Sequence, residues 1–491
     1  MAEKKWPSSW DVVIVGAGMS GINAAHHIQK RLPHFRVTIL EERSRIGGTW
    51  DFFKYPGLRS DTDLHSFGFG WRPWKENRAI ADGPSIVRYL EDAVKEDGTY
   101  HQMQFETHVV SASWSTKSQS WHIAAEKSGV SVNLDARFMI LATGYYDYKE
   151  ALRPNIAGLD NPQFKGQVIH PQFWPEGLDY DGKDVVIIGS GATAVTILPS
   201  MAERVNSVTM LQRSPAYIMS INNKTGGSWL HKILPQSWSF KLDRLFFICF
   251  TACVFYFCRL FPVRSRAMLE GAVAKQLPSH VSVDPHFHPR YQPWDQRVCM
   301  APDGDFFKSL HSGKAAVETG VVKATTEDSL ILDSGKTLKA DIVITATGLK
   351  LRIGGHINFS VDGKPINLAE RHAWRSALLQ DIPNLAFMLG YVNASWTLGS
   401  EVTSEYICRI LQRMERSGKT SVVPRKQKQQ GVALNPQPIW NLAATYVKES
   451  QREMPVCGHV GPWRERTIYF WDLWQARYGS ITDCLEYSVG Y

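Results

Sequence analysis

Asp11–Gly21 reads DVVIVGAGMSG, and this stretch decides the fold of the first part of the chain. Asp11–Val15 is an apolar run that ends in glycine, which is typical of a parallel β-strand buried on both faces. Ser20–Gln29 is expected to form a helix, and Arg36–Glu41 the next strand. Together they predict a βαβ unit of a doubly wound α/β domain.

Gly16, Gly18 and Gly21 give the spacing GxGxxG between this strand and this helix. Gly16 allows a tight turn, Gly18 lets the backbone approach a pyrophosphate, and Gly21 permits close packing of helix on strand. The N-terminus of the helix, which includes Ser20, adds free N–H groups. Glu41 ends the next strand, where a carboxylate can bind ribose hydroxyls. The alternative is a glycine-rich turn that binds nothing.

Two short segments after Glu41 carry the next candidate residues. Gly47-Gly48-Thr49-Trp50 follows the acid, and in flavoproteins of this build such glycines let the backbone pass close to the flavin ribityl chain. This favours FAD at the first site. Tyr55–Asp61 (YPGLRSD) comes next, and Asp61 is a candidate active-site carboxylate. The alternative for Asp61 is a turn acid or a helix cap.

A second unit of the same kind begins at Asp184–Ile188 (DVVII). A helix is expected from Ala192, and a strand over Ser207–Arg213. The strand ends in Arg213-Ser214 without an acid, and arginine suits a 2′-phosphate better than a free hydroxyl. The second site is therefore expected to bind NADPH rather than NADH, and the alternative for Arg213 is an exposed surface cation. The glycine motif here is GxGxxA, with the candidate residues Gly189, Ser190, Gly191, Thr193 and Ala194.

Two strand ends carry the same small residues. Asp341–Thr345 is expected to be a buried strand that ends at Ala346-Thr347-Gly348, and an earlier strand ends at Ala142-Thr143-Gly144. Such residues permit close approach of a cofactor or of a crossing chain. Gly418–Pro438 is polar and contains proline, so it is expected to be a surface loop.

The expected fold class is α/β, with two Rossmann-like dinucleotide-binding domains and a helical insertion in the second. The first part of the FAD-binding domain is expected over 1–150 and its second part over 353–491. The NADP-binding domain is expected over 151–216 and 297–352, and the helical insertion over 217–296.

Composition limits the other classes of function. The chain has 491 residues and a net charge of +8, which is modest for this length, so nucleic acid is not an expected partner. Its seven cysteines are an odd number without zinc spacing, which indicates a reducing compartment. The N-terminal segment MAEKKWPSSW lacks the apolar core of a signal peptide, so a cytoplasmic location is expected.

Leu245–Cys258 (LFFICFTACVFYFC) is an uncharged run between two arginines. About 14 residues at ~1.5 Å per residue fall short of a ~30 Å hydrocarbon core, so a single span is not expected. The first interpretation is a buried helix of the insertion. The alternative is a helix that dips into a membrane face or shapes a lipophilic substrate entrance, which would make the protein membrane-associated.

Phe164–Pro175 (FKGQVIHPQFWP) lies between the two glycine sites. With GxGxxG before it and GxGxxA after it, the chain resembles the type I Baeyer–Villiger monooxygenases, whose linker reads FxGxxxHxxxW followed by Pro or Asp. GGTW, YPGLRSD, MLQRSP, PWDQR and GYVNASWTL are similar to the branch that contains the ethionamide-activating monooxygenase.

This resemblance implies roles for several residues. Arg297 matches the arginine that stabilises a C4a-peroxyflavin, and Asp61 matches the carboxylate that positions it. His170 belongs to the linker that couples cofactor motion to catalysis. The resemblance implies FAD contacts for Ser20, Glu41, Thr49, Trp50, Asp61 and Val109, and NADP contacts for Arg59, Ser60, Thr193 and Arg213. Gln296 departs from the family, because many members have Lys directly before the catalytic arginine.

The implied activity is an NADPH-consuming, FAD-dependent insertion of one oxygen atom of O₂ beside the carbonyl of a lipophilic ketone. The alternative is oxygenation of sulfides, thioamides or amines by the same intermediate. A flavin disulfide reductase shares the two-site plan but needs a cysteine pair near the first domain, and no cysteine precedes Cys249. A nucleotide-binding protein without turnover, or an NADPH oxidase that releases peroxide, is the third possibility.

Overall fold

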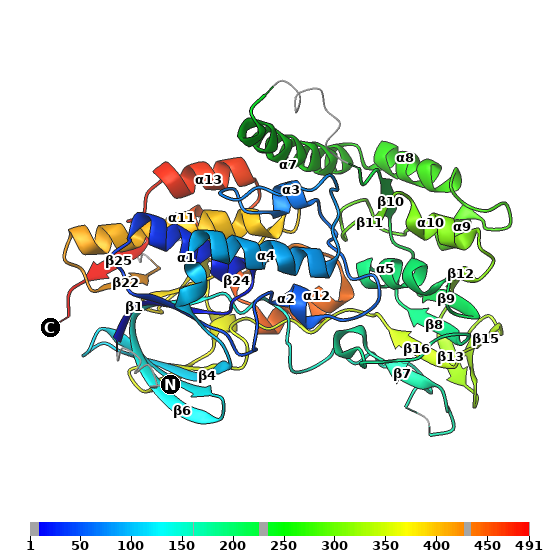
Figure 1. Ribbon diagram of the computed structural model, residues 1–491, viewed down its shortest axis with the longest axis horizontal. Coiled ribbons are helices and arrows are strands. Elements are labelled where there is room, and N and C mark those ends of the chain that lie inside the picture. Colours follow the sequence, from blue (N-terminus) through cyan, green and yellow to red (C-terminus); the bar gives the residue numbers. More distant parts are fainter. Residues whose placement is uncertain (1–8, 161, 225–233, 427–433, 491) are drawn as a thin grey trace.

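A computed structural model describes residues 9–160, 162–224, 234–426 and 434–490 of the protein. Two sheets organise the described chain, a mixed sheet of eleven strands and a parallel sheet of five (Figure 1). Each sheet contains one of the expected βαβ units, so the predicted fold class is confirmed. Most of the N-terminal segment on which the expectation of a cytoplasmic location rests lies outside the described residues.

The first sheet is built around β1 (Ser9–Val15), whose Val12–Ile14 stretch is fully buried. It pairs in parallel with β2 (Val37–Leu40) on one side and with β6 (Val130–Leu141) on the other. The helix between β1 and β2 is α1 (Met19–Arg31), close to the expected range. The other strands of this sheet are β3 (Met103–Gln104), β4 (Thr107–Ser115), β5 (Ser120–Lys127), β17 (Asn358–Val361), β18 (Lys364–Ile366), β19 (Ala373–Trp374), β20 (Leu378–Leu379) and β21 (Leu385–Phe387).

The second sheet has the order β12-β9-β8-β16-β7, and all its strands are parallel. The strands are β7 (Gln167–Ile169), β8 (Asp184–Ile188), β9 (Ser207–Gln212), β12 (Ala315–Thr319) and β16 (Ile342–Thr345). Helix α5 (Ala192–Met201) follows β8, and α10 (Asp305–Leu310) packs against α5. A small antiparallel sheet of β13 (Val322–Thr325), β14 (Ser329–Leu332) and β15 (Thr337–Lys339) lies beside β8.

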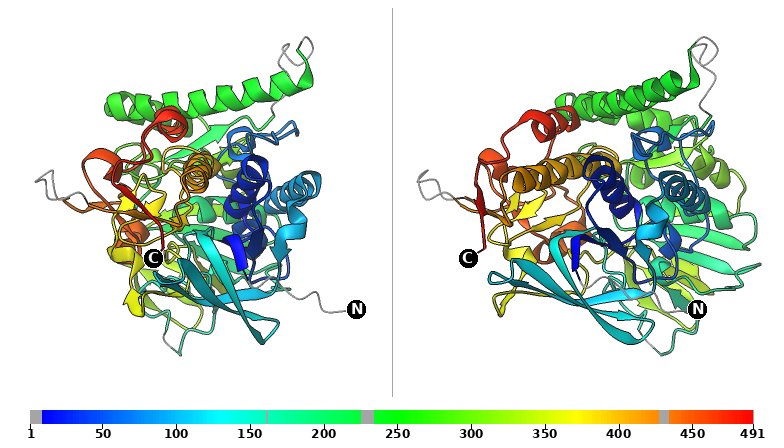
Figure 2. Two further views of the ribbon diagram at one scale, coloured as in Figure 1. Left: turned by 90° about the vertical axis from the view of Figure 1, so that its left-hand side faces the viewer. Right: turned by 60° about the vertical axis from the view of Figure 1, so that its left-hand side comes forward.

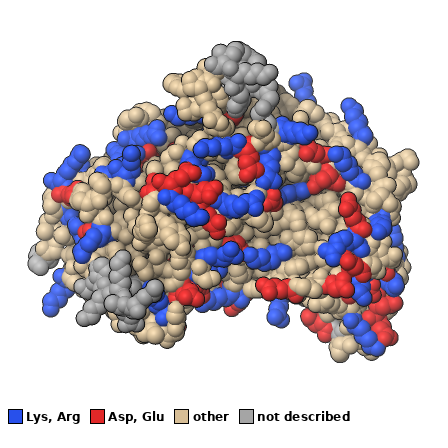
Figure 3. All heavy atoms as spheres, viewed as in Figure 1, with Lys and Arg blue, Asp and Glu red and all other residues tan. Residues whose placement is uncertain are grey.

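Further helices complete the layer around the first sheet. α11 (Trp396–Arg416) lies against α1, and α13 (Tyr469–Tyr478) lies on α11 (Figures 1 and 2). The shorter helices here are α2 (Thr49–Phe52), α3 (Leu64–Phe67), α4 (Gly83–Asp97) and α12 (Thr445–Glu449). Lys and Arg side chains alternate with Asp and Glu over the face seen in Figure 3, so this face has no single sign of charge.

The segment 217–296 contains one strand and three described helices. They are β10 (Ile218–Ile221), α7 (Gln236–Leu260), α8 (Pro262–Ala274) and α9 (Val283–His286). β10 pairs in parallel with β11 (Cys299–Pro302), which lies just beyond the segment. The segment expected to be a helical insertion thus also contains a strand, which pairs with the chain just after the segment.

The first interpretation of Leu245–Cys258 as a buried helix is wrong. These residues belong to α7, a helix of 25 residues on the surface, in which only Ser239, Ile248 and Cys258 are buried. An apolar helix is expected to be covered on all sides, but the described chain provides a packing layer for only one side of α7. Within the described residues no single helix meets the length and apolarity needed to cross a membrane, although α7 and α8, bent by 115°, meet them together.

Gly418–Pro438 is not a plain surface loop either. Its residues Ser421–Pro424 form β22, which is buried along its whole length and pairs antiparallel with β25 (Leu485–Ser488). Near its end, β23 (Gln437–Pro438) pairs with β24 (Val456–Cys457). The part at 427–433 lies outside the described residues. Both partner strands are distant in the sequence, so composition alone could not reveal the pairing.

Asn384 joins β22 to the first sheet. It is fully buried, its amide donates to the carbonyls of Arg137 (2.7 Å) and Thr420 (2.9 Å), and its oxygen accepts from the N–H of Val422 (2.8 Å). These three hydrogen bonds to backbone groups need both the donor and the acceptor of an amide side chain.

We predict that Asn384→Ala lowers the free energy of unfolding by about 2–4 kcal/mol, because it removes one buried and two partly buried hydrogen bonds to backbone groups. Urea unfolding followed by tryptophan fluorescence measures the change. Asn133→Ala, at an exposed position of β6, is the matched control and is expected to unfold like the wild type. Equal midpoints for the two variants would contradict the role of Asn384.

Candidate functional site

One large cavity runs between the two sheets and reaches both glycine loops. Its volume is about 1210 Å³, which exceeds the roughly 300–1,000 Å³ of a usual small-ligand pocket. Its walls include β1, the start of α1, the start of α5 and the turn that precedes β11. The size and the two loops suit two nucleotide ligands in one cavity.

The first glycine of each loop has the same environment. Gly16 has a φ of +108°, and a Cβ there would lie 2.5 Å from the carbonyl oxygen of Ala142. Gly189 has a φ of +139°, and a Cβ there would lie 2.2 Å from the carbonyl oxygen of Ala346. A side chain is excluded at both positions by backbone conformation and by contact. Each glycine loop therefore rests directly on the small residues that end the neighbouring strand.

The two loops also present uncapped helix ends to the cavity. Gly18 is the N-cap of α1 and Gly191 that of α5, and neither helix start has a side-chain cap. The first N–H groups of these helices are thus available to an anion such as a pyrophosphate. Gly21 and Ala194 lie behind the loops and do not line the cavity: Gly21 packs on the carbonyl of Gly16, and Ala194 is in the core.

Glu41 is positioned at the end of β2 by backbone hydrogen bonds. Its carboxylate is buried and accepts from the N–H of Ala17 (2.7 Å) and of Arg43 (3.0 Å). These bonds fix the side chain beside the first glycine loop, where it lines the cavity. Thr49 lines the same part of the cavity and shares a hydrogen bond of 2.7 Å with the hydroxyl of Tyr148.

The second loop is flanked by residues of several segments. The Ser190 hydroxyl donates to the carbonyl of Ser214 (2.8 Å), which ties the loop to the segment after β9. Arg213 reaches across to the hydroxyl of Thr445 at 3.4 Å. Arg59 is engaged in an ion pair with Asp305 at the start of α10. The predicted residues of this site therefore meet at one wall of the cavity, although Arg59 already has a carboxylate partner.

Arg297 lines the same cavity as the two glycine loops. Its Nη1 is 3.1 Å from Oδ2 of Asp61, and its Nη2 donates to the carbonyl of Tyr391 at 3.5 Å. Both partners of the ion pair line the cavity, which accounts for side-chain exposures of 35% and 38%. Burial lowers the pKa of Arg297, but Asp61, Tyr145, Tyr446 and Tyr146 together raise it above its ordinary value, and the charge of Asp61 is the largest of these opposing effects. The guanidinium is therefore a permanent positive charge in this place.

Aromatic side chains form the wall next to Arg297. Tyr145 stacks on Trp396 with ring centroids 4.5 Å apart, and its hydroxyl shares a hydrogen bond of 2.6 Å with that of Tyr146. Trp396 in turn donates to the hydroxyl of Ser20 at 2.9 Å. Burial raises the pKa of Tyr145, Tyr146 and Tyr446 above the ordinary value. These phenols stay neutral and can donate hydrogen bonds while they exclude water.

His170 of the linker also lines the cavity. Its Nδ1 accepts a hydrogen bond of 3.2 Å from the N–H of Gln172, and burial lowers its pKa below the ordinary value. The imidazole is therefore neutral and is held by the backbone of its own linker, two residues further on.

Most of the residues singled out from the sequence line this one cavity. They are Gly16, Gly18, Ser20, Glu41, Gly48, Thr49, Trp50, Arg59, Ser60, Asp61, Val109, Gly189, Ser190, Gly191, Thr193, Arg213, Ser214 and Arg297. Four further residues that line the cavity had no role predicted from the sequence: Tyr145, Trp396, Thr445 and Tyr446. The tyrosine-rich turn and the motif around Trp396 were visible signals, whereas nothing around Tyr446 distinguished it.

The chain is similar to known proteins in sequence and in fold. Residues 14–82 match the model of an NAD(P)-binding Rossmann-like domain, and residues 76–245 match that of the flavin-binding monooxygenase-like family. The chain is 41% identical over 475 residues to the FAD-containing monooxygenase EthA of Mycobacterium tuberculosis, which covers 96% of each protein. It is also 41% identical over 468 residues to a probable FAD-binding monooxygenase, AlmA, of Acinetobacter baylyi, covering 94% of this chain and 92% of the other.

Solved structures share the fold. OTEMO in complex with FAD and NADP has a TM-score of 0.75 at 19% identity, covering 99% of this chain and 100% of the other. Cyclohexanone monooxygenase bound to ε-caprolactone has a TM-score of 0.73 at 19% identity, covering 98% and 100%. At 19% identity, these similarities show that the fold is shared.

We predict that replacing Gly189 by alanine lowers stability, whereas replacing Gly191 by alanine weakens cofactor binding. Gly189→Ala forces a strained backbone and a clash, so it lowers the free energy of unfolding by about 2 kcal/mol or more. At Gly191 a Cβ would meet no atom within 4 Å, so Gly191→Ala is expected to keep wild-type thermal stability but to weaken binding of NADP⁺, because a methyl group at the second glycine hinders the approach of the backbone to a pyrophosphate. Differential scanning fluorimetry and calorimetric titration measure the two effects. Identical behaviour of the two variants would refute this geometry.

Proposed function

Since the chain belongs to the family of FAD-containing monooxygenases, we propose that it catalyses Baeyer–Villiger oxidation of a lipophilic ketone. One oxygen atom of O₂ enters beside the carbonyl to give an ester or lactone, and the other is reduced to water by the two electrons of NADPH with uptake of a proton. The observation that carries the proposal is the Arg297–Asp61 ion pair in the cavity between the two glycine loops.

FAD fits the first glycine loop. The uncapped start of α1 offers N–H groups for the pyrophosphate, and the fixed carboxylate of Glu41 accepts from the ribose hydroxyls. A Cβ at Gly48 would lie 3.1 Å from the Cα of Gly18. A side chain at Gly48 would therefore press on the glycine loop that we propose binds the pyrophosphate. When bound and reduced, FAD supplies the activation of O₂. The other contacts proposed for FAD are Ser20, Thr49, Trp50, Asp61 and Val109.

NADPH fits the second glycine loop. The start of α5 would hold the pyrophosphate, and Arg213 at the end of β9 would pair with the 2′-phosphate. Gln296 lines the same cavity without a charge, so Arg213 carries the preference for the phosphorylated cofactor. To bind the cofactor, Arg59 would have to break its ion pair with Asp305. Ser60, Thr193 and Ser214 would supply short polar side chains at this wall of the cavity.

Arg297 acts on the charge of the transferred oxygen. A guanidinium favours an oxygen anion by Coulomb attraction, and the effect grows where the neighbouring aromatic wall excludes water. Asp61 orients the guanidinium through one carboxylate oxygen. Because the raised pKa of Arg297 keeps it charged, it stabilises negative charge and does not serve as a proton donor.

Each sheet forms the centre of one proposed cofactor-binding domain. Residues 1–150 and 353–491 contribute the strands of the first sheet and constitute the FAD-binding domain. Residues 151–216 and 297–352 constitute the NADP-binding domain, and 217–296 are inserted in it. The strand pair β10–β11 supports this division, because it brings the insertion back to the segment that carries Arg297.

Oxygenation of sulfides, thioamides or amines is the second candidate. It has the same cofactors and site, and it differs in the atom that accepts the oxygen. The FAD-loaded protein with NADPH is offered a cyclic ketone and a thioether, and the products are identified by mass spectrometry. Lactone as the main product supports the proposal, and sulfoxide alone favours the second candidate. Hydrogen peroxide equal to the NADPH consumed, with every substrate, would rule out both.

We predict that Arg297→Ala is still reduced by NADPH but forms oxygenated product about 10²–10³-fold more slowly. The reason is the loss of the positive charge that stabilises the oxygen anion. Stopped-flow absorbance follows reduction, and gas chromatography follows product. Arg290→Ala removes an exposed arginine of the same segment and is expected to match the wild type. Normal product formation by Arg297→Ala would remove Arg297 from this role.

A further inference from the structure

The outer side of α7 is a continuous apolar surface. Its exposed side chains recur every three or four residues over the whole helix, which is roughly 36 Å long at ~1.5 Å per residue. Phe246 is 61% exposed and Leu260 70%. We call this surface the α7 stripe, and it consists of Trp238, Leu242, Leu245, Phe246, Cys249, Phe250, Cys253, Tyr256, Phe257 and Leu260.

Exposed apolar side chains are concentrated around this stripe. α8 adds Val263 and Met268, and α13 adds Trp471, Trp474 and Tyr478. α7, α8 and α13 lie along the same edge of the molecule in Figures 1 and 2. Outside 236–274 and 468–478, the strongly exposed large apolar residues of the described chain are the six scattered residues Tyr100, Val130, Val168, Phe173, Val321 and Val489. Scattered residues need no explanation, whereas a contiguous face of this size indicates an interaction site.

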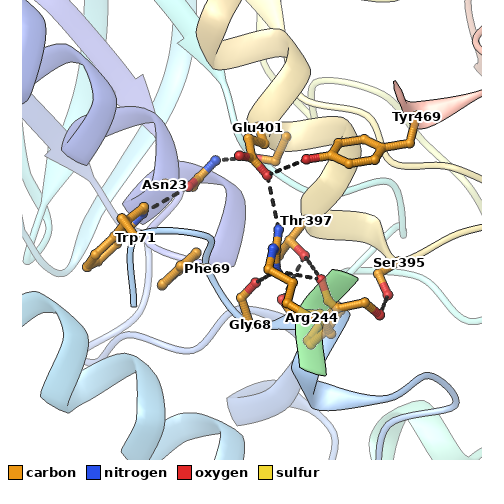
Figure 4. A network of polar contacts seen from close by, with 12 residues as sticks. Asn23, Gly68, Phe69, Trp71, Arg244, Ser395, Thr397, Glu401 and Tyr469 are labelled. Carbon is orange, nitrogen blue, oxygen red and sulfur yellow. Dashed lines mark hydrogen bonds and ion pairs between the residues drawn. The ribbon is translucent and has the colours of Figure 1, made fainter. Parts of the chain in front are cut away.

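The inner side of α7 is held firmly on the protein. Nη1 of Arg244 donates to the carbonyls of Ser66 (3.0 Å) and His65 (3.3 Å), and Nη2 is 3.0 Å from Glu401 of α11. Glu401 also accepts a hydrogen bond of 3.1 Å from Tyr469 of α13, as Figure 4 shows. These contacts hold α7 along the surface of the protein with the stripe facing outward.

Cations accompany the stripe. Lys241 and Arg259 lie near its two ends, Arg264 follows on α8, and Arg477 lies on α13, and all four are exposed. Lys241 and Arg264 lie over the rings of Trp238 and Phe261, at 6.0 and 5.8 Å. Arg259 also pairs with Asp295, and Arg477 with Glu405.

The acids of the three helices are less exposed than these cations. They are Asp243, Glu270 and Asp472, and all three are partly buried. Glu270 pairs with His288, and Asp472 accepts from the hydroxyl of Tyr391. The edge therefore presents apolar side chains between positive charges.

We propose that this edge docks on the surface of an anionic lipid bilayer. A helix that lies in the interface has an apolar side rich in Phe, Leu and Trp and cations at its margin, which bind anionic headgroups. A protein partner is less well matched, because about one hydrogen bond per 100–200 Å² is usual at a protein interface, and the stripe consists of side chains that form few hydrogen bonds. Docking does not depend on the proposed oxidation, since it requires no turnover.

The test is co-sedimentation of the FAD-loaded protein with vesicles. The expected result is binding to phosphatidylcholine vesicles that contain phosphatidylglycerol, and weaker binding to pure phosphatidylcholine or at high salt. Phe246→Ser with Phe250→Ser, two exposed rings that stack at 5.9 Å, is expected to reduce the partition coefficient at least about tenfold. The rate of NADPH oxidation is expected to stay at the wild-type level, which shows that the variant is folded.

The matched control is Tyr100→Ser with Val130→Ser, which removes two exposed apolar side chains elsewhere on the surface. It should bind vesicles like the wild type. Wild-type protein that stays in the supernatant with anionic vesicles would overturn the proposal, as would equal binding by the α7 variant. Light scattering adds a further outcome: a wild-type dimer that the α7 variant abolishes, without vesicle binding, would show that a second copy of the chain covers the stripe.

Discussion

The ion pair between Arg297 and Asp61 is the contact on which the rest of the site depends. Its partners are 236 positions apart in the sequence. Asp61 follows the glycine segment of the first nucleotide unit, and Arg297 stands on a turn at the end of the inserted segment. The pair can form only when both units and the insertion are packed together. It places a permanent positive charge in the wall of the cavity that both glycine loops also line.

The turn before Arg297 is held from two sides. The N–H of Ala443 donates to the carbonyl of Asp295 at 2.8 Å, and the carboxylate of Asp295 accepts from the N–H of Gln292 at 3.0 Å. Trp294 has a φ of +69°, a conformation that costs about 1–3 kcal/mol for a residue other than glycine. Its ring packs on Phe255 of α7 at 5.5 Å. Arg244 of the same helix donates to the carbonyls of His65 and Ser66, in the segment that follows Asp61. Helix α7 therefore contacts the segments that carry both partners of the ion pair.

The sequence predicted the parts of the structure that local patterns determine. The strand, the glycine motif and the following helix are contiguous, and their chemistry is the same in any context, so both nucleotide loops could be placed from Gly16 and Gly189 alone. The resemblance then supplied Arg297 and Asp61. The exposure of α7 could not be predicted, because an apolar run does not tell whether another layer covers it. The strand at Ser421–Pro424 and the place of Tyr446 in the cavity wall depend on contacts with distant segments, which no local pattern encodes.

A double-mutant cycle tests most directly whether Arg297 and Asp61 act as one unit. Oxygenated product per NADPH is measured for Arg297→Ala, for Asp61→Asn and for the variant with both changes. If the carboxylate acts only through the guanidinium, the double variant loses no more product than Arg297→Ala alone. Losses that multiply independently would contradict the account, because each residue would then contribute to oxygen transfer by a separate route.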